Sequence, residues 1–170
     1  MLQYKCFDLS MWSDDHKWSI NEWHESIQNQ DSFECFDNIV DAMGVVESPK
    51  YVALVQPENP RIRNGKIIYN KMKIIHLEEW MEEDEIAFKS FIESIIDSNG
   101  LNELIPNPVI TATAYPVIAD VWNVAEMAAS KTIFSMGFAS IEEKASAYAM
   151  NYDRIIRECH NFIVDRGFKS

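Results

Sequence analysis

The sequence predicts an α+β fold, with about five helices packed against a small antiparallel sheet in the central hairpin region 51–76. Apolar residues recur at helical spacing on both sides of that region. Between them lie a short β-branched run and an Asn-Gly pair, which favour strands and a tight turn. Because 47% of the 170 residues are hydrophobic and 12% are aromatic, the chain can bury a core. We expect one globular domain over residues 1–170.

The N-terminal part predicts an edge strand and two short helices. The strand is expected from Gln3 to Leu9. Ser19 and Glu22 have capping-box spacing, so a helix is expected to follow them. The next helix is expected from Asp31 or Ser32, with Gly44 as its C-cap. The apolar positions of the two helices are Ile20, Trp23 and Ile27, and then Phe33, Phe36, Ile39, Val40 and Met43.

The middle of the chain predicts strands. Tyr51 to Val55 is short, apolar and bounded by Pro49 and Pro57, which is typical of a buried strand. Asn64-Gly65 favours a type I′ hairpin turn. A further strand is expected at Met72 to His76 after Asn70-Lys71, and which of the two turns forms the hairpin stays open.

The C-terminal half predicts three helices. The first starts at Glu82, has Phe88, Phe91, Ile92, Ile95 and Ile96 on one stripe, and stops at Asn99-Gly100. An Ala-rich helix is expected from Pro116 to Ser130. The last helix has a capping box at Ser140 and Glu143 and ends at Gly167. Its apolar stripe is Ile141, Ala145, Tyr148, Tyr152, Ile155, Ile156, Cys159, Phe162 and Ile163.

Charge is distributed unevenly along a chain whose formal net charge is -12. Residues 78–85 hold six carboxylates and no base, whereas residues 61–73 hold five bases and no acid. A surface with a large net negative charge repels phosphates and anionic lipids, so we expect neither a nucleic-acid nor a membrane partner. The two blocks could instead pair with each other inside the fold.

The cysteines and the N-terminus predict a cytoplasmic protein. Cys6, Cys35 and Cys159 are odd in number and widely spaced, which is typical of reduced, buried thiols. The first eight residues have no apolar segment behind basic residues, and no window approaches 18 uncharged apolar residues.

Catalytic signatures are missing from the sequence. The five glycines are scattered, so no phosphate-binding loop is expected, and no G-x-S-x-G elbow occurs. Cys159 lies on an apolar stripe, which favours a packed thiol over a nucleophile. We therefore expect no catalytic residues and no cofactor. A minor alternative is a small metal-dependent enzyme using His16 and His24 with nearby carboxylates, although their spacing is poor for a metal.

Tryptophans among carboxylates are typical of an interface for a basic protein. The alternative is that these tryptophans close the core and the carboxylates are simply solvated. We expect Trp80 to anchor the main surface, and a second surface is formed by the N-terminal set. A short acidic chain without a catalytic signature is similar in profile to immunity proteins and other inhibitors of basic nucleases or toxins. That profile implies an antitoxin-type inhibitor, and a homo-oligomeric structural or adaptor domain built on the two last helices is the alternative. The expected partner-binding residues are Glu78, Glu79, Trp80, Glu82, Glu83, Asp84 and Glu85, then Asp14, Asp15, Trp18, Glu22 and Trp23.

Overall fold

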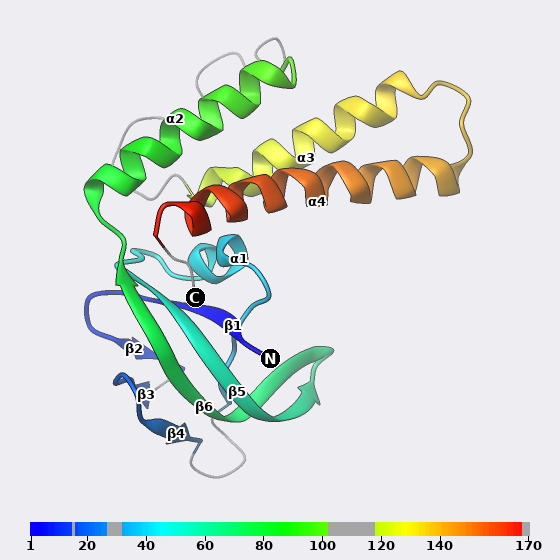
Figure 1. Ribbon diagram of the computed structural model, residues 1–170. Coiled ribbons are helices and arrows are strands. Elements are labelled where there is room, and N and C mark those ends of the chain that lie inside the picture. The colour runs from blue at the N-terminus through cyan, green and yellow to red at the C-terminus, as the bar shows by residue number, and fades with distance from the viewer. Residues whose placement is uncertain (15, 27–31, 102–117, 168–170) are drawn as a thin grey trace. The chain divides into compact units, whose positions relative to one another are not determined.

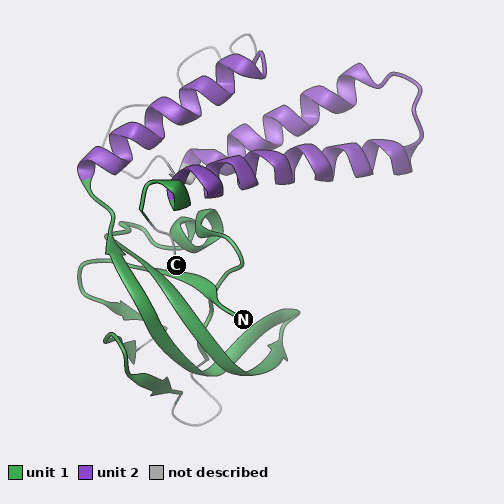
Figure 2. Ribbon diagram, in the orientation of Figure 1, with its two compact units in different colours: residues 1–81, 164–170 green, residues 82–163 purple. Residues whose placement is uncertain are grey.

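The computed structural model describes residues 1–14, 16–26, 32–101 and 118–167 (Figure 1). It divides into two compact units: unit 1 is Met1–Met81 with Val164–Ser170, and unit 2 is Glu82–Ile163 (Figure 2). Each unit is described by itself. The α+β class is confirmed, with four helices rather than about five in the described part of the chain.

Unit 1 is built on a four-stranded antiparallel sheet in the order β1-β5-β6-β4. Its strands are β1 (Gln3–Phe7), β4 (Trp23–Glu25), β5 (Tyr51–Arg63) and β6 (Lys66–Glu79). A two-stranded ribbon pairs β2 (Trp12–Ser13) with β3 (His16–Lys17), and the described part of the unit also contains one short helix, α1 (Ile39–Gly44). The expected edge strand near Gln3 is therefore confirmed, two residues shorter than predicted.

The long hairpin β5–β6 turns at Asn64-Gly65, where both residues have positive φ, 53° and 77°. A type I′ turn requires that conformation, so the predicted turn is confirmed. The turn we expected at Asn70-Lys71 is wrong, because β6 runs through it without a break.

We also expected Pro57 to end the strand, and this was wrong. β5 continues through Pro57 and Pro60 to Arg63. Its pairing with β1 stops at Val55, whereas its pairing with β6 continues to Arg63. Beyond Val55, one side of β5 is therefore unpaired among the described strands, and a proline facing that side removes no ladder hydrogen bond.

The N-terminal helix predicted after Ser19 is absent. Ile20 instead forms a bridge with Ile74, Asn21 donates its N–H to the Ile74 carbonyl, and β4 pairs with β6. The Ser19 hydroxyl does donate to the Glu22 carboxylate over 2.6 Å, so the polar contact formed without the helix. Pairing with an existing strand outweighed the local helical spacing. Ile27 lies outside the described residues.

The second predicted helix begins much later than expected. Phe33 forms a bridge with Tyr69 of β6, and Phe36 forms one with Tyr4 of β1. Helix α1 starts only at Ile39, after Asn38, whose side-chain oxygen accepts the N–H of Asp41. Its C-cap is Val45 with φ near -89°, so the αL cap expected at Gly44 is wrong.

These bridges link segment 33–36 to strands on both sides of β5, over the apolar core of the unit. That core consists of Phe7, Trp18, Phe33, Ala53, Val55, Tyr69, Met72 and Ile74. Phe33 stands near its centre: it is fully buried and its ring packs edge-on against Trp18, with centroids 4.6 Å apart. Phe33, which we expected on the apolar stripe of a helix, is therefore part of the core beneath the sheet.

The described part of unit 2 consists of α2 (Glu82–Ser98), α3 (Ile118–Ser135) and α4 (Ile141–Asp165), and the last two residues of α4 belong to unit 1. The predicted α2 and its stop are confirmed, since Gly100 has φ of 63°. The capping contact of α4 is also confirmed, because the Ser140 hydroxyl accepts the Glu143 N–H over 3.1 Å. Pro116, the expected start of α3, lies outside the described residues.

Aromatic stacking joins α2 to the end of α4. The Phe91 and Phe162 rings stack with centroids 4.3 Å apart, and Phe88 packs beside them. The buried apolar residues in the described part of α3 are Val121, Val124, Ala125, Ala128 and Ala129, beside the buried Asp120, and those of α4 are Ile155, Ile156, Cys159 and Ile163. In the described part of the chain no helix is long and apolar enough to cross a membrane.

Candidate functional site: an acid-lined groove in unit 1

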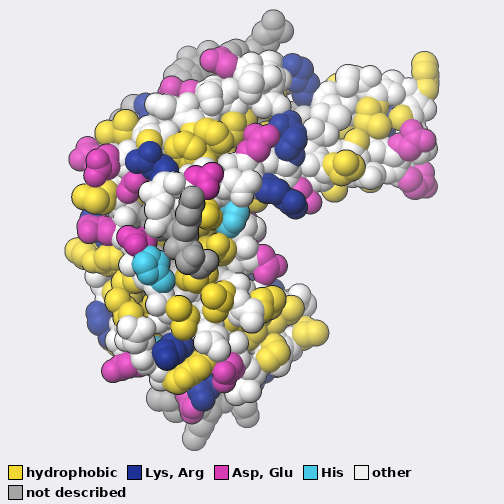
Figure 3. Space-filling view, in the orientation of Figure 1, with side chains coloured by type: hydrophobic (Ala, Val, Ile, Leu, Met, Phe, Trp, Pro, Cys, Tyr) yellow, Lys and Arg dark blue, Asp and Glu magenta, His cyan; other side chains and the backbone are white. Residues whose placement is uncertain are grey.

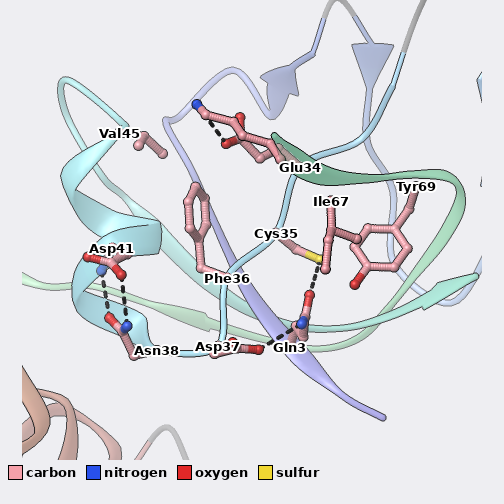
Figure 4. Close-up of a pocket in the computed structure, with 11 residues that line it drawn as sticks. Gln3, Glu34, Cys35, Phe36, Asp37, Asn38, Asp41, Val45, Ile67 and Tyr69 are labelled. Carbon is pink, nitrogen blue, oxygen red and sulfur yellow. Dashed lines mark hydrogen bonds and ion pairs between the residues drawn. The ribbon is translucent and has the colours of Figure 1, made fainter. Parts of the chain in front are cut away.

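A groove of about 390 Å³ opens on unit 1 between α1, the start of β1 and the turn end of β6 (Figure 4). We call it the acidic groove. Three carboxylates and one lysine line it, together with apolar walls. Its lining residues are Gln3, Glu34, Cys35, Phe36, Asp37, Asn38, Asp41, Val45, Lys66, Ile67 and Tyr69.

The two backbone bridges of segment 33–36 place the groove's wall. Tyr4 and Phe36 exchange both N–H···O bonds at 2.8 Å, which fixes Glu34, Cys35 and Asp37 beside β1. The chain then enters α1, and Asn38 caps that helix. The groove therefore forms where an extended segment leaves the sheet and becomes a helix.

A chain of side-chain hydrogen bonds holds the floor. The Cys35 thiol donates to the Gln3 side-chain oxygen over 2.6 Å, and the Gln3 amide donates to Asp37 over 2.8 Å. Burial raises the pKa of the Cys35 thiol to about 12, so it stays protonated and remains a donor. The same burial makes Cys35 a poor nucleophile, because a thiol reacts as its thiolate.

The charges of the groove are unbalanced. Lys66 Nζ lies 3.6 Å from the Glu34 carboxylate and is largely exposed, and the buried Lys5 ammonium binds the Glu34 carbonyl. Asp37 is exposed at the rim, and one of its oxygens accepts the Gln3 amide. Asp41 accepts a bond from the Asn38 amide over 2.8 Å. The lining therefore holds three carboxylates and one lysine, so its formal charge is negative.

Apolar walls accompany these acceptors. Phe36, Val45 and Ile67 line the groove, and Tyr69 closes its base with a phenol whose pKa is raised by burial. Carboxylates at the rim and apolar walls below suit the long stem and charged head of a lysine or arginine side chain. The arrangement can bind a cation by charge-assisted hydrogen bonds.

The acidic run 78–85 is divided between the two units. Glu78 and Glu79 end β6, where Glu79 lies 2.8 Å from Lys50 and Glu78 lies 2.7 Å from His76. Glu82, Glu83, Asp84 and Glu85 form the first turn of α2, where carboxylates are favoured by the helix dipole. Glu82 and Glu83 are exposed, and within the described residues no cation lies within ion-pair distance of either.

Trp80 does not fit the anchor role we expected. Only 5% of Trp80 is exposed, and its backbone N–H donates to the Lys50 carbonyl over 2.7 Å. An anchor must be accessible before it enters a partner's pocket. This expectation is therefore corrected: the run offers carboxylates but no exposed tryptophan.

The N-terminal surface is also corrected. Trp18 is 3% exposed and belongs to the core, and Asp14 lies 2.6 Å from the buried Lys5 ammonium. Glu22 and Trp23 remain exposed, with Lys71 Nζ over the Trp23 ring at 4.8 Å. Asp15 lies outside the described residues. Two of the four described members therefore point inward, because the core needed an aromatic ring and the buried lysine needed a counter-charge.

The basic block 61–73 lies on the turn end of the β5–β6 hairpin. Lys71 pairs with Glu25 at 3.6 Å and with Glu58 at 4.0 Å, and Lys66 pairs with Glu34. Glu78 and Glu79 lie at the opposite end of β6, 12 or more residues from Lys66. At about 3.3 Å per residue that is about 40 Å, so these two carboxylates do not pair with the turn end.

The metal site that we considered at His16 and His24 is supported by one contact between the two histidines. His16 Nε2 lies 2.7 Å from His24 Nδ1, and His24 Nε2 lies 3.0 Å from the Ser19 carbonyl, which only accepts. Within the described residues no group of three His, Cys, Asp or Glu side chains is arranged for a metal ion.

The comparisons with family models, curated proteins and solved structures returned no match to this chain.

Sequence reasoning missed the acidic groove because its walls come from segments it assigned to a helix. Glu34 and Asp37 fall within the helix that we expected from Asp31 or Ser32 to Gly44. One signal was available: Asn38 followed by Asp41 has capping spacing, and it places the helix start after Asp37.

Proposed function

We propose that this chain is a non-catalytic protein that binds and neutralises a basic protein, as immunity proteins and antitoxins do with a nuclease or another toxin. The observation that carries the proposal is the acidic groove, where Glu34, Asp37 and Asp41 outnumber Lys66 around about 390 Å³. The partner would insert a lysine or arginine side chain there. Its stem would lie along Ile67 and Val45, and its charged head would meet Asp37 and Glu34.

Electrostatics supports a basic partner at longer range as well. The net charge of -12 attracts a cationic surface and accelerates encounter, most strongly at low ionic strength. An inhibitor of a phosphate-binding enzyme gains selectivity when it presents carboxylates where phosphates would bind. The exposed Glu82 and Glu83 of α2 are a second set of carboxylates for such a partner.

The experiment captures partners on the tagged full chain from its native cell lysate at low salt, followed by elution with salt and mass spectrometry. Three proteins are compared: the wild type, the groove variant Glu34→Gln/Asp37→Asn, and the control Glu93→Gln/Glu126→Gln. The control removes the same charge from exposed positions on α2 and α3. We expect a stoichiometric basic protein with the wild type and the control, and a large loss with the groove variant.

Association and dissociation rates measured with that purified partner then distinguish long-range electrostatic attraction from binding in the groove. The control should slow association slightly through its lost charge, whereas the groove variant should also raise the dissociation rate by about tenfold or more. Charge reversal at Glu82, Glu83 and Asp84 tests the α2 carboxylates in the same assay. The proposal fails if no basic protein is captured, or if the groove variant and its control bind alike.

A further inference from the structure

Two Asn-Gly dipeptides occur in this chain, Asn64-Gly65 and Asn99-Gly100. Asparagine is a thermolabile residue, and it is least stable when a glycine follows it. The backbone nitrogen of the glycine can then attack the side-chain carbonyl carbon of the asparagine, because glycine has no Cβ to hinder the approach. The two dipeptides lie in very different surroundings.

Asn64-Gly65 lies at an exposed end of the β5–β6 hairpin in unit 1. Residues 62–67 are all exposed, and hydrophobic side chains are visible on the surface at this end of the hairpin in Figure 3. A Cβ at Gly65 would meet no atom within 4 Å. The Asn64 side chain makes no hydrogen bond to another described residue. Few buried contacts therefore hold the turn closed, and such segments open at a low cost in free energy.

Asn99-Gly100 is held by its neighbours in unit 2. The Asn99 side-chain nitrogen donates to a carbonyl of α2 over 2.8 Å, and its side-chain oxygen accepts from Arg154 Nη2 over 2.8 Å. Lys131 Nζ donates to the Asn99 and Gly100 carbonyls over 3.0 Å. The Gly100 N–H, whose nitrogen would have to attack, donates to the Asp97 carbonyl over 3.1 Å. Every reacting group of this dipeptide is therefore bonded to a neighbour.

We propose that Asn64 is a spontaneous modification site that loses its side-chain amide, and that the contacts of Asn99 protect it from the same reaction. The Gly65 nitrogen forms a bond to Cγ of Asn64 and gives up its proton. The bond from Cγ to the side-chain nitrogen breaks, and ammonia leaves. Water then opens the resulting cyclic imide at either of its carbonyls, which gives aspartate or isoaspartate. The reaction consumes only water and needs no oxidant, reductant or enzyme.

Opening of the turn limits the rate. In the closed turn the φ angles of Asn64 and Gly65 are 53° and 77°. Arg63 and Lys66 form the ladder pair that closes it. The glycine nitrogen reaches Cγ only when the backbone rotates between Cα and the carbonyl carbon of Asn64, so the type I′ turn has to open first. Opening is rarer at the other dipeptide, because it also has to break bonds from α3 and α4.

The products change the turn in two ways. Either product adds a carboxylate, so the net charge becomes more negative than -12. Isoaspartate also carries the main chain through Cβ, which lengthens the backbone and removes the type I′ geometry. The new charge lies two residues from Lys66, the lysine of the acidic groove. The inference does not depend on the proposed function of that groove.

Peptide mapping by mass spectrometry tests the inference on the full chain, warmed at neutral pH and sampled over weeks. The readout at each asparagine is the small mass gain that accompanies the exchange of an amide for a carboxylate. We expect Asn64 to react at least about tenfold faster than Asn99, whose side chain is held by two hydrogen bonds. In guanidinium chloride the two rates should become alike, because both dipeptides are then equally accessible.

Two variants separate the chemistry from the surroundings. Asn64→Gln should remove the main acidic species from isoelectric focusing, because its longer side chain has to close a larger ring. Arg154→Gln removes a donor to Asn99 and should accelerate the reaction there while the Asn64 rate stays unchanged. Circular dichroism melting checks that both variants stay folded.

Three results would overturn the inference. The first is a folded chain in which Asn64 reacts no faster than Asn99. The second is an Asn64 that stays intact in the folded chain over the time in which it reacts in guanidinium chloride. The third is a folded Arg154→Gln protein in which the Asn99 rate is unchanged, since the contacts of Asn99 would then not be what protects it.

Discussion

Lys5 Nζ lies 2.6 Å from Oδ2 of Asp14, and only 4% of the lysine is exposed. The same ammonium donates to the Glu34 carbonyl over 2.7 Å and lies 5.5 Å from the Trp18 ring centroid. A buried cation needs these partners, because an unpaired charge costs several kcal/mol in the interior. The contact also joins β1 to the ribbon β2–β3 and to the wall of the acidic groove.

Asp14→Ala should therefore lower the free energy of unfolding by about 3 kcal/mol, because it leaves the Lys5 ammonium buried without its counter-charge. Lys5→Met in the same protein should recover much of that loss, since the buried charge is then gone. The measurement is chemical denaturation, with Glu83→Ala on exposed α2 as the control that changes stability by less than about 0.5 kcal/mol. An Asp14→Ala loss no larger than the control's would contradict the structural role of the pair.

The sequence predicted the fold best where local patterns and tertiary contacts agree. Asn64-Gly65, the stripe of α2 and the Ser140 cap are set by neighbouring residues, and all three are confirmed. The helices predicted for residues 19–26 and 32–36 were wrong, because Ile20, Phe33 and Phe36 form bridges with residues that are distant in sequence, namely Ile74, Tyr69 and Tyr4. Periodicity carries no information about such partners.

The candidate site was less predictable than the fold for the same reason. Runs of acidic residues in the sequence include the exposed Glu82 and Glu83. They also include Asp14, which pairs with a buried lysine, and sequence alone does not distinguish exposed carboxylates from paired ones. The acidic groove gathers Gln3, Asp37 and Lys66 from three segments, and only the bridges of segment 33–36 bring them together.

The three thiols should react slowly in the folded protein. Burial raises the pKa of Cys35 and of Cys159 to about 12 and also raises that of Cys6, so little thiolate is present at pH 8. Labelling with an aromatic disulfide reagent should be more than about 1,000-fold slower than for a free thiol. In guanidinium chloride all three should react at once. Rapid labelling of the native Cys35→Ser variant would show that Cys6 or Cys159 is accessible.

His160 on α4 should make stability depend on pH. Burial, and then the charge of Arg157, lower its pKa below 6.5, so the folded chain binds this proton more weakly than the unfolded chain does. The free energy of unfolding should therefore fall as the pH drops below 6.5, until the pH reaches the lowered folded value.

The variant His160→Gln isolates that contribution. Its stability should fall less than the wild type's between pH 7 and pH 5, as measured by urea denaturation at each pH. Arg157→Gln removes only the smaller of the two causes and should change the slope slightly. Parallel pH profiles for the wild type and His160→Gln would mean that the histidine titrates equally in the folded and unfolded chains.

The hairpin turn offers a test of backbone conformation alone. Gly65 has φ of 77°, and a Cβ placed there would meet no atom within 4 Å. Gly65→Ala should therefore destabilise the protein by about 1 kcal/mol through the left-handed conformation and not through a clash. Lys66→Ala, at the next exposed position, is the matched control and should cost less than about 0.5 kcal/mol. Thermal unfolding of both variants measures the difference, and a Gly65→Ala protein as stable as the control would show that the turn relaxes to a conformation with negative φ.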